Sequence, residues 1–262
     1  YRGSPKFPLF NIYEVLLFFF NKTKKLDYLK PVELILKQLC SQGIYDHVEG
    51  GISRYTIDEH WLVPHFEKML YDNAQFVLLL SKYINIEKNK YFEKKIIQTI
   101  DFINKNFINP DNKLLGSAYD ADSDKEEGKY YTFSYEELKE IEDIDHYFEV
   151  KPEGNWENKI ILKEIKLPTE RILLELKLLR KKKNKPFFDS KVQLDLNCLW
   201  VSALLSAEKI LPNNNFLILA ENYYKNLEKI FFSKERLQHT ILKPEVFLED
   251  YAYSTAMLLD LY

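Results

Sequence analysis

The sequence predicts an all-α fold made of consecutive helical hairpins. Apolar residues recur every three or four positions through most of the chain, which is the period of an α-helix packed along one face. Short polar links separate the long helical patterns, so neighbouring helices should run antiparallel. Strand-like patterns are confined to a middle region, which we expect to form a small β insertion.

The amino-terminal part of the chain predicts four helices. Two of them are expected to begin at a proline, Pro31 and Pro64, because proline is favoured at the first helical position. Gly43 is expected to follow the end of the second helix. The four predicted ranges are 9–20, 31–42, 64–84 and 90–108.

The middle region, 109–163, loses the helical period. Its segments GKYYTF (128–133) and KIILK (159–163) suggest short strands, and Ser134 with Glu137 predicts a capping box. Helices then resume, and their predicted ranges are 170–182, 190–211, 213–232 and a last one from about 248.

Composition limits the class of protein. A chain of 262 residues with a net charge of −3 and a pI near 6.1 lacks the basic excess of a nucleic-acid binder, and one domain is the default expectation. The basic run RKKKNK (180–185) is interpreted as a solvated face or linker. The apolar segment 12–20 is shorter than the about 20 residues that span a bilayer, so no membrane partner is expected.

Cys40 and Cys198 are far apart, and each lies in an apolar helical pattern. Buried free thiols are therefore expected rather than a disulfide, which suits a reducing, cytoplasmic location.

The segment from 43 to 73 concentrates glycine, histidine and charged residues. Gly50 and Gly51 are adjacent in a polar loop, which permits a positive φ or close approach of another group. On a helix that starts at Pro64, His65 and Asp72 would lie about 20° apart on one face and could serve one cavity. A first-turn position would also keep His65 neutral and suited to act as a base. The alternative is that these polar residues only tie a loop to the core.

The stretch AYDADSDKEEGKYY contains paired carboxylates. In extended chain, Asp120 and Asp122 would point to one side and could act as acid and base. A calcium loop fits poorly, because Lys125 stands where the turn needs glycine and Tyr131 where the bidentate glutamate belongs. The remaining alternative is a polar loop whose aspartates bind their own backbone.

Further candidates could bind a substrate. Trp61 and Trp156 could stack on a sugar ring or plug the core edge, and Arg54 with Tyr55 could bind hydroxyls or pair with Asp58. Glu249, Asp250 and Tyr251 open the last predicted helix, where carboxylates also serve as favourable first-turn charges. His47, His60 and His65 would form a zinc site only if loops gathered them, so neither a metal nor another cofactor is expected.

Ordered blocks along nearly the whole chain carry a family resemblance. They are SPKFP (4–8), YDH, GG, RY, Asp58, Trp61, PHFEKMLYDNA (64–74), AYDADS (118–123), EEGKYY (126–131), GNWE (154–157) and LEDYAY (248–253). The chain resembles the thioredoxin-domain-containing proteins of uncertain activity, the spermatogenesis-associated thioredoxin-like group. It departs from that pattern at Glu49, at His60 and at LDLNCL (194–199), which replaces a Trp-Asn-Gly pattern and affects one expected wall of the site.

The resemblance implies a six-hairpin, glycosidase-like α/α toroid, similar to the N-acylglucosamine 2-epimerases. The chain holds fewer long helices than a complete toroid, so an incomplete ring is expected, a fragment lacking an amino-terminal thioredoxin-like domain and some carboxy-terminal hairpins. Two functions follow: a sugar site of epimerase or glycosidase type, or a non-catalytic scaffold partnering the thioredoxin-like domain. For the sugar site the catalytic candidates are His65, Asp72, Asp120, Asp122, Glu249 and Asp250, and the substrate-binding candidates are His47, Arg54, Tyr55, Trp61, Trp156 and Tyr251.

Overall fold

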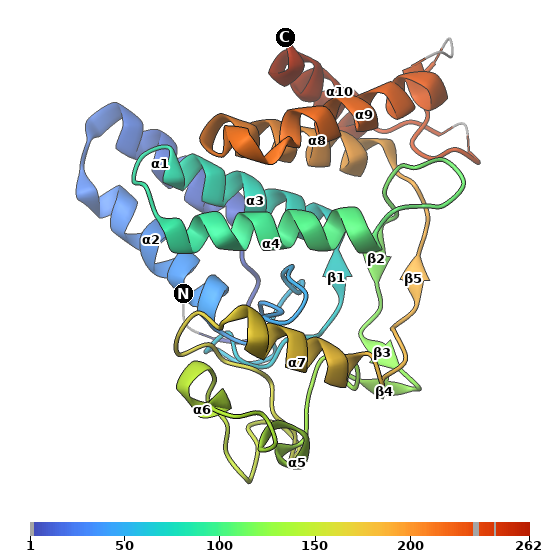
Figure 1. Cartoon of the computed structure of the whole chain (residues 1–262). Coiled ribbons are helices and arrows are strands. Elements are labelled where there is room, and N and C mark those ends of the chain that lie inside the picture. Colours follow the sequence, from blue (N-terminus) through green and yellow to red (C-terminus); the bar gives the residue numbers. More distant parts are fainter. Residues whose placement is uncertain (1–2, 233–235, 244) are drawn as a thin grey trace. The chain divides into compact units, whose positions relative to one another are not determined.

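The chain is folded as two compact units in the computed structural model, which describes residues 3–232, 236–243 and 245–262 (Figure 1). The first unit comprises Tyr1–Lys68 and Tyr119–Phe187, and the second comprises Met69–Ala118 and Phe188–Tyr262. The expectation that the whole chain forms one toroid domain stays a prediction.

The first unit begins with an antiparallel helical hairpin, α1 (Phe10–Thr23) and α2 (Leu26–Ser41), drawn in blue in Figure 1. The buried side chains of α2 follow the predicted helical stripe and include Val32, Ile35, Leu36 and Leu39. The predicted start of α2 was wrong: the helix begins at Leu26 and holds Pro31 in its interior, because the apolar stripe already begins at Leu29.

The remainder of the first unit is built from short elements. They are β3 (Asp122–Ser123), β4 (Glu126–Glu127), α5 (Tyr135–Leu138), α6 (Ile144–Tyr147) and α7 (Glu170–Arg180). The capping box is confirmed: Glu137 donates its backbone N–H to Ser134 Oγ at 3.2 Å, and Ser134 donates its own to Glu137 Oε2 at 2.7 Å. The two predicted strands are reduced to an isolated bridge between Phe133 and Ile160, whose side chains enter the hydrophobic core of this unit.

The second unit packs its helices around α8 (Leu194–Ile210), which contacts α3 (Leu70–Ile84), α9 (Phe216–Leu227) and α10 (Leu248–Leu261). Trp200, Leu204 and neighbouring α8 side chains are fully buried, as expected of a central helix. Helix α4 (Lys90–Asn106) pairs with α3, and Asn89 caps it by accepting from the N–H groups of Tyr91 and Phe92. Two short helical turns, η1 (Pro212–Asn214) and η2 (Glu228–Phe232), flank α9.

Three strands form one sheet in the order β1 (Lys68–Met69), β2 (Ala118–Tyr119), β5 (Phe188–Asp189). In the second unit Leu70 N–H donates to the Ser117 carbonyl, and Ser117 N–H to that of Asp189. In the first unit Asp120 N–H donates to the Phe187 carbonyl.

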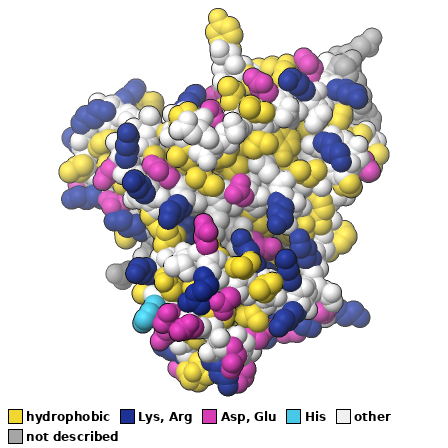
Figure 2. All heavy atoms as spheres, in the orientation of Figure 1, with side chains coloured by type: hydrophobic (Ala, Val, Ile, Leu, Met, Phe, Trp, Pro, Cys, Tyr) yellow, Lys and Arg dark blue, Asp and Glu magenta, His cyan; other side chains and the backbone are white. Residues whose placement is uncertain are grey.

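The surface and the thiols agree with the composition. Acidic and basic side chains are interspersed over the face drawn in Figure 2, as expected from a nearly balanced charge. Cys40 and Cys198 are buried and free, so this expectation is confirmed. Among the described residues, no helix has both the length and the apolar character needed to cross a membrane.

Candidate functional site

Accessibility and hydrogen bonding separate the five histidines. His60 and His146 lie on the surface, with 78% and 71% of their side chains exposed. His47 is fully buried, and His239 has both ring nitrogens engaged, with Gln193 and Asp250. His65 is one-third exposed and has one ring nitrogen within hydrogen-bonding distance of a carboxylate, which is the arrangement a general acid or base needs.

His65 does not lie on a helix. The prediction that Pro64 starts the third helix was wrong, because residues 64–67 form no helix, Phe66 has a φ of 62°, and α3 begins at Leu70. His65 N–H donates to the Tyr55 carbonyl, and Arg54 N–H donates to the Glu67 carbonyl, so the segment pairs with the preceding loop. His65 and Asp72 therefore do not share a helix face.

The His65 ring lies between aromatic and acidic side chains of the first unit. It stacks on Tyr55 with a centroid distance of 4.8 Å, and Tyr55 in turn stacks on Phe7. Its Nδ1 is 3.0 Å from Glu127 Oε1, whereas its Nε2 is 3.9 Å from Glu67 Oε2, beyond hydrogen-bonding distance. Glu127 can thus hold the proton on Nδ1 and leave Nε2 to exchange a proton with a ligand.

Arg54 borders the same surface and forms an ion pair with Glu67 at 3.5 Å, with 43% of its side chain exposed. A pair of Arg54 with Asp58, considered as the alternative to ligand binding, is not among the described contacts of Asp58. The Asp58 carboxylate accepts instead from the N–H groups of His60, Leu62 and Val63. The structure thus brings Arg54, Tyr55 and His65 together as predicted candidates.

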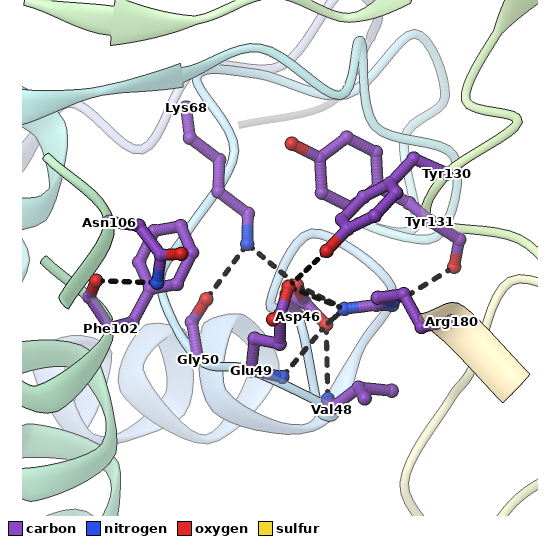
Figure 3. A network of polar contacts seen from close by, with 10 residues as sticks. All are labelled: Asp46, Val48, Glu49, Gly50, Lys68, Phe102, Asn106, Tyr130, Tyr131 and Arg180. Atoms are coloured by element: carbon purple, nitrogen blue, oxygen red, sulfur yellow. Dashed lines mark hydrogen bonds and ion pairs between the residues drawn. The ribbon is translucent and has the colours of Figure 1, made fainter. Parts of the chain in front are cut away.

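A buried ion network lies in the first unit (Figure 3). Asp46 accepts from Lys68 Nζ at 2.6 Å and, through both carboxylate oxygens, from Arg180 Nη1 at 2.7 Å. Lys68 also donates to the Gly50 carbonyl, and Tyr130 donates its hydroxyl to Glu49. Asp46, Lys68 and Arg180 are each at least 90% buried, so each charge is stabilised by the other charged groups rather than by water.

The network alters the ionisation of its members. Burial alone would raise the pKa of Asp46, but the charges of Arg180 and Lys68 outweigh it and hold this pKa well below its usual range. Burial, reinforced by Glu49, raises the pKa of the Tyr130 phenol. A cavity of about 20 Å³ between Arg180, Asp46 and Tyr131 has room for a single water and excludes a sugar.

This network was missed in the sequence, and the interpretation of its basic run was wrong in part. Arg180 is 3% exposed and Lys183 donates to the Thr132 carbonyl, whereas Lys181, Lys182 and Lys185 are exposed as expected. The sequence did contain one signal that Arg180 is buried. Arg180 falls on the same face of α7 as the buried Ile172 and Leu176.

The acidic loop of the first unit is exposed. Asp120 accepts from the backbone N–H groups of Ala121 at 2.7 Å and of Asp122 at 3.4 Å, which is the self-satisfied loop anticipated as the alternative. Asp122 lies in β3 opposite Glu127, the carboxylate that contacts His65.

Three predicted binding residues are occupied by packing. His47 has its ring between the Glu164 carboxylate, at 3.3 Å, and the Gln42 carbonyl, at 3.1 Å. Trp61 is 4% exposed, and Trp156 packs against Phe66 with a centroid distance of 5.2 Å. In this conformation these rings support the fold of the first unit.

The second unit contains a cavity of about 860 Å³ with a histidine at its wall. His239 Nδ1 is 3.0 Å from Asp250 Oδ1 and 3.7 Å from Asp195 Oδ1, and His239 Nε2 is 2.8 Å from Gln193 Nε2. Asp250 also accepts from Phe247 N–H at the start of α10, as a first-turn carboxylate should. Burial raises the pKa of Asp195.

The other predicted site residues of the second unit do not belong to the cluster of Asp195, His239 and Asp250. Glu249 and Tyr251 are exposed on α10, and Asp72 is buried in the first turn of α3. Asp195 and His239 were not selected from the sequence, although Asp195 falls in LDLNCL, the segment that departs from the family pattern.

The comparisons with known proteins give similarity without a family assignment, and no family model matches the chain. Human spermatogenesis-associated protein 20 is 27% identical over 87% of this chain, and the uncharacterized protein B0495.5 of Caenorhabditis elegans is 24% identical over 99% of it. The chain spans only 37% and 44% of these two relatives.

Solved structures show the fold. A family 76 glycoside hydrolase from Bacteroides thetaiotaomicron superposes with a TM-score of 0.57 at 13% identity, and cellobiose 2-epimerase from Bacillus thermoamylovorans with 0.56 at 12% identity. Each match covers 96% of this chain, and 41% and 50% of the respective neighbour. The predicted all-α fold of α/α-toroid type is therefore confirmed.

Proposed function

We propose that the chain is a carbohydrate-active α/α-toroid domain that transfers a proton on a sugar, with His65 as the acid or base. The observation that carries this proposal is the His65–Glu127 pair: one ring nitrogen is held at 3.0 Å by a carboxylate while the ring remains one-third exposed. The fold supports the substrate class, because the toroids it resembles include an epimerase and a glycoside hydrolase acting on carbohydrates.

Proton transfer suits this surface better than hydrolysis does. Epimerisation needs a base next to a sugar carbon, which an imidazole that is one-third exposed provides. Inverting hydrolysis needs two carboxyl groups about 6.5–9.5 Å apart with a water between them. Asp120 already accepts from its own backbone, which weakens its candidacy as a hydrolytic acid.

Exchange of a sugar hydrogen with solvent tests the proposal directly. The chain is incubated with free aldoses and disaccharides in D2O, and deuterium at the carbon next to the anomeric centre is followed by NMR. We expect exchange in the wild type and a loss of about 10²- to 10⁴-fold in His65→Gln. Glu127→Gln should lower the rate less, since Glu127 positions the ring without touching the sugar, and the exposed His60→Gln is the matched control.

No exchange with any sugar, or equal exchange in His65→Gln, would remove the acid-base role. Calorimetry on the same proteins separates binding from chemistry, because loss of exchange with binding retained identifies His65 as a reacting group.

A second candidate function is a non-catalytic scaffold that binds a glycan or protein beside a thioredoxin-like domain. It is favoured by the packing of His47 and Trp61, which removes two expected sugar contacts from the surface. Sugar binding without hydrogen exchange in the full-length parent protein would support it.

A further inference from the structure

Three potential metal ligands meet in the second unit. Asp195 lies in the first turn of α8, Asp250 in the first turn of α10, and His239 in the segment between η2 and α10. One ligand atom from each, two carboxylate oxygens and Nδ1 of the imidazole, fall within 4.8 Å of one another. Ligands bound at about 2.0–2.2 Å to one tetrahedral ion are about 3.3–3.6 Å apart, so side-chain movements of about 1 Å would complete the geometry.

The cluster has more negative charge than its neighbours neutralise. Asp250 is fully buried, and Asp195 Oδ1 is buried with no hydrogen-bond partner. Within the described ranges, no lysine or arginine pairs with either carboxylate, and their one cationic candidate is His239. Even a protonated His239 would leave one uncompensated negative charge, and such charges in a buried site are costly unless a cation binds.

The polar groups behind His239 fit a ligand histidine. Its Nε2 contacts the Gln193 amide, whose oxygen is 2.8 Å from Ser117 Oγ. A half-turn of that amide would present its oxygen to an Nε2–H, while Ser117 could still donate to the Lys191 carbonyl at 2.7 Å. A partner that accepts from the far nitrogen is what orients most metal-binding histidines.

We propose that Asp195, His239 and Asp250 bind one divalent transition-metal ion at the edge of the 860 Å³ cavity. One imidazole with two carboxylates suits zinc, cobalt or manganese, and three protein ligands leave a position open to water or to a hydroxyl group from the cavity. An ion bound at Nδ1 requires that nitrogen to carry no proton, so a neutral His239 would hold its one ring proton on Nε2, facing Gln193. This site is separate from His65 and does not depend on the proposed acid-base function.

Metal titration of the purified chain, stripped with chelator, tests the site. We expect one equivalent of Zn²⁺ to bind by calorimetry, and Co²⁺ to give the visible absorption of a nitrogen- and oxygen-ligated ion. Asp195→Asn should lower the affinity for the metal at least about tenfold. Loss of a residue that only orients a ligand lowers affinity by about that much, and loss of a ligand itself should lower it more. Asp189→Asn is the matched control, because Asp189 lines the same cavity and pairs with Lys191.

Wild-type protein that binds no stoichiometric Zn²⁺ or Co²⁺ would overturn the proposal, and so would undiminished binding in Asp195→Asn. If circular dichroism shows that Asp195→Asn is misfolded, His239→Gln takes its place with the same expectation. Hydrogen exchange by His65 can be measured in buffer that contains a chelator, so failure of either proposal leaves the other standing.

Discussion

The two units each contain a cluster of charged side chains, and the clusters differ in how their charge is balanced. In the first unit, Asp46 lies between Lys68 and Arg180, both within 2.7 Å, and the adjoining cavity holds about 20 Å³. In the second unit, Asp195 and Asp250 share His239, and His239 lines a cavity of about 860 Å³.

This difference distinguishes a cluster that stabilises the fold from a cluster that can bind a ligand. A buried carboxylate that already forms ion pairs with protein cations has no free oxygen for a ligand. Its removal should destabilise the fold, because the cations would stay buried without a partner. A buried carboxylate oxygen that accepts no hydrogen bond retains capacity for a ligand. We therefore expect mutations in the first cluster to affect stability and those in the second to affect binding.

The largest effect should come from Asp46→Asn, which leaves Lys68 and Arg180 buried without their anion. We expect the free energy of unfolding to fall by about 3–5 kcal/mol, measured by urea denaturation. In metal-free buffer Asp195→Asn should change the free energy of unfolding by no more than about 1 kcal/mol, because Asp195 Oδ1 has no hydrogen bond to lose. Equal losses in the two variants would contradict the distinction between the clusters.

Acid should weaken the first cluster selectively. The folded-state pKa of Asp46 is depressed, so its contribution is present above the unfolded-state pKa of about 3.9 and is lost as pH falls toward the folded value. The stability difference between wild type and Asp46→Asn should be constant between about pH 5 and 7 and shrink below about pH 4. A difference that persists unchanged at pH 3 would argue against an ionised Asp46 as the stabilising group.

Glycine substitutions should give intermediate losses in both units. A Cβ at Gly43 would lie 2.0 Å from the Leu62 carbonyl oxygen, and one at Gly116 would lie 2.6 Å from the Phe188 ring. We expect Gly43→Ala and Gly116→Ala to cost about 1–3 kcal/mol each by thermal unfolding. Gly43→Ala should cost more, because its Cβ would lie 2.0 Å from a backbone oxygen, whereas the backbone oxygen that a Cβ at Gly116 would meet, that of Asp189, is 2.7 Å away. The reverse order would show that the backbone at Leu62 moves more readily than the contacts around Gly116.

The smallest effect concerns the thiol of the second unit. Burial raises the pKa of Cys198 to about 12, so the thiol stays protonated at pH 8 and should resist iodoacetamide in the native protein. Mass spectrometry should find it alkylated only after denaturation. Rapid native labelling would show that the α8 region opens readily.

Among the residues chosen from the sequence, His65, Arg54 and Tyr55 do lie together. His65 was expected on a helix from Pro64, beside Asp72, whereas backbone hydrogen bonds of residues 54 and 55 with 67 and 65 place it beside Arg54 and Tyr55. Local pattern predicts that polar groups cluster, but hydrogen bonding with a distant segment decides whether the chain there is helical or extended.

The sequence by itself determined the helical hairpins, the capping box at Ser134, the buried thiols and the all-α class, because periodicity and caps act within a few residues. Only the tertiary structure decided which charges are buried together. Asp46 and Arg180 are 134 positions apart, and Asp195 meets Asp250 through His239. A charged side chain in a sequence looks solvated by default, and only its neighbours in space determine whether it stabilises the fold or remains available to a ligand.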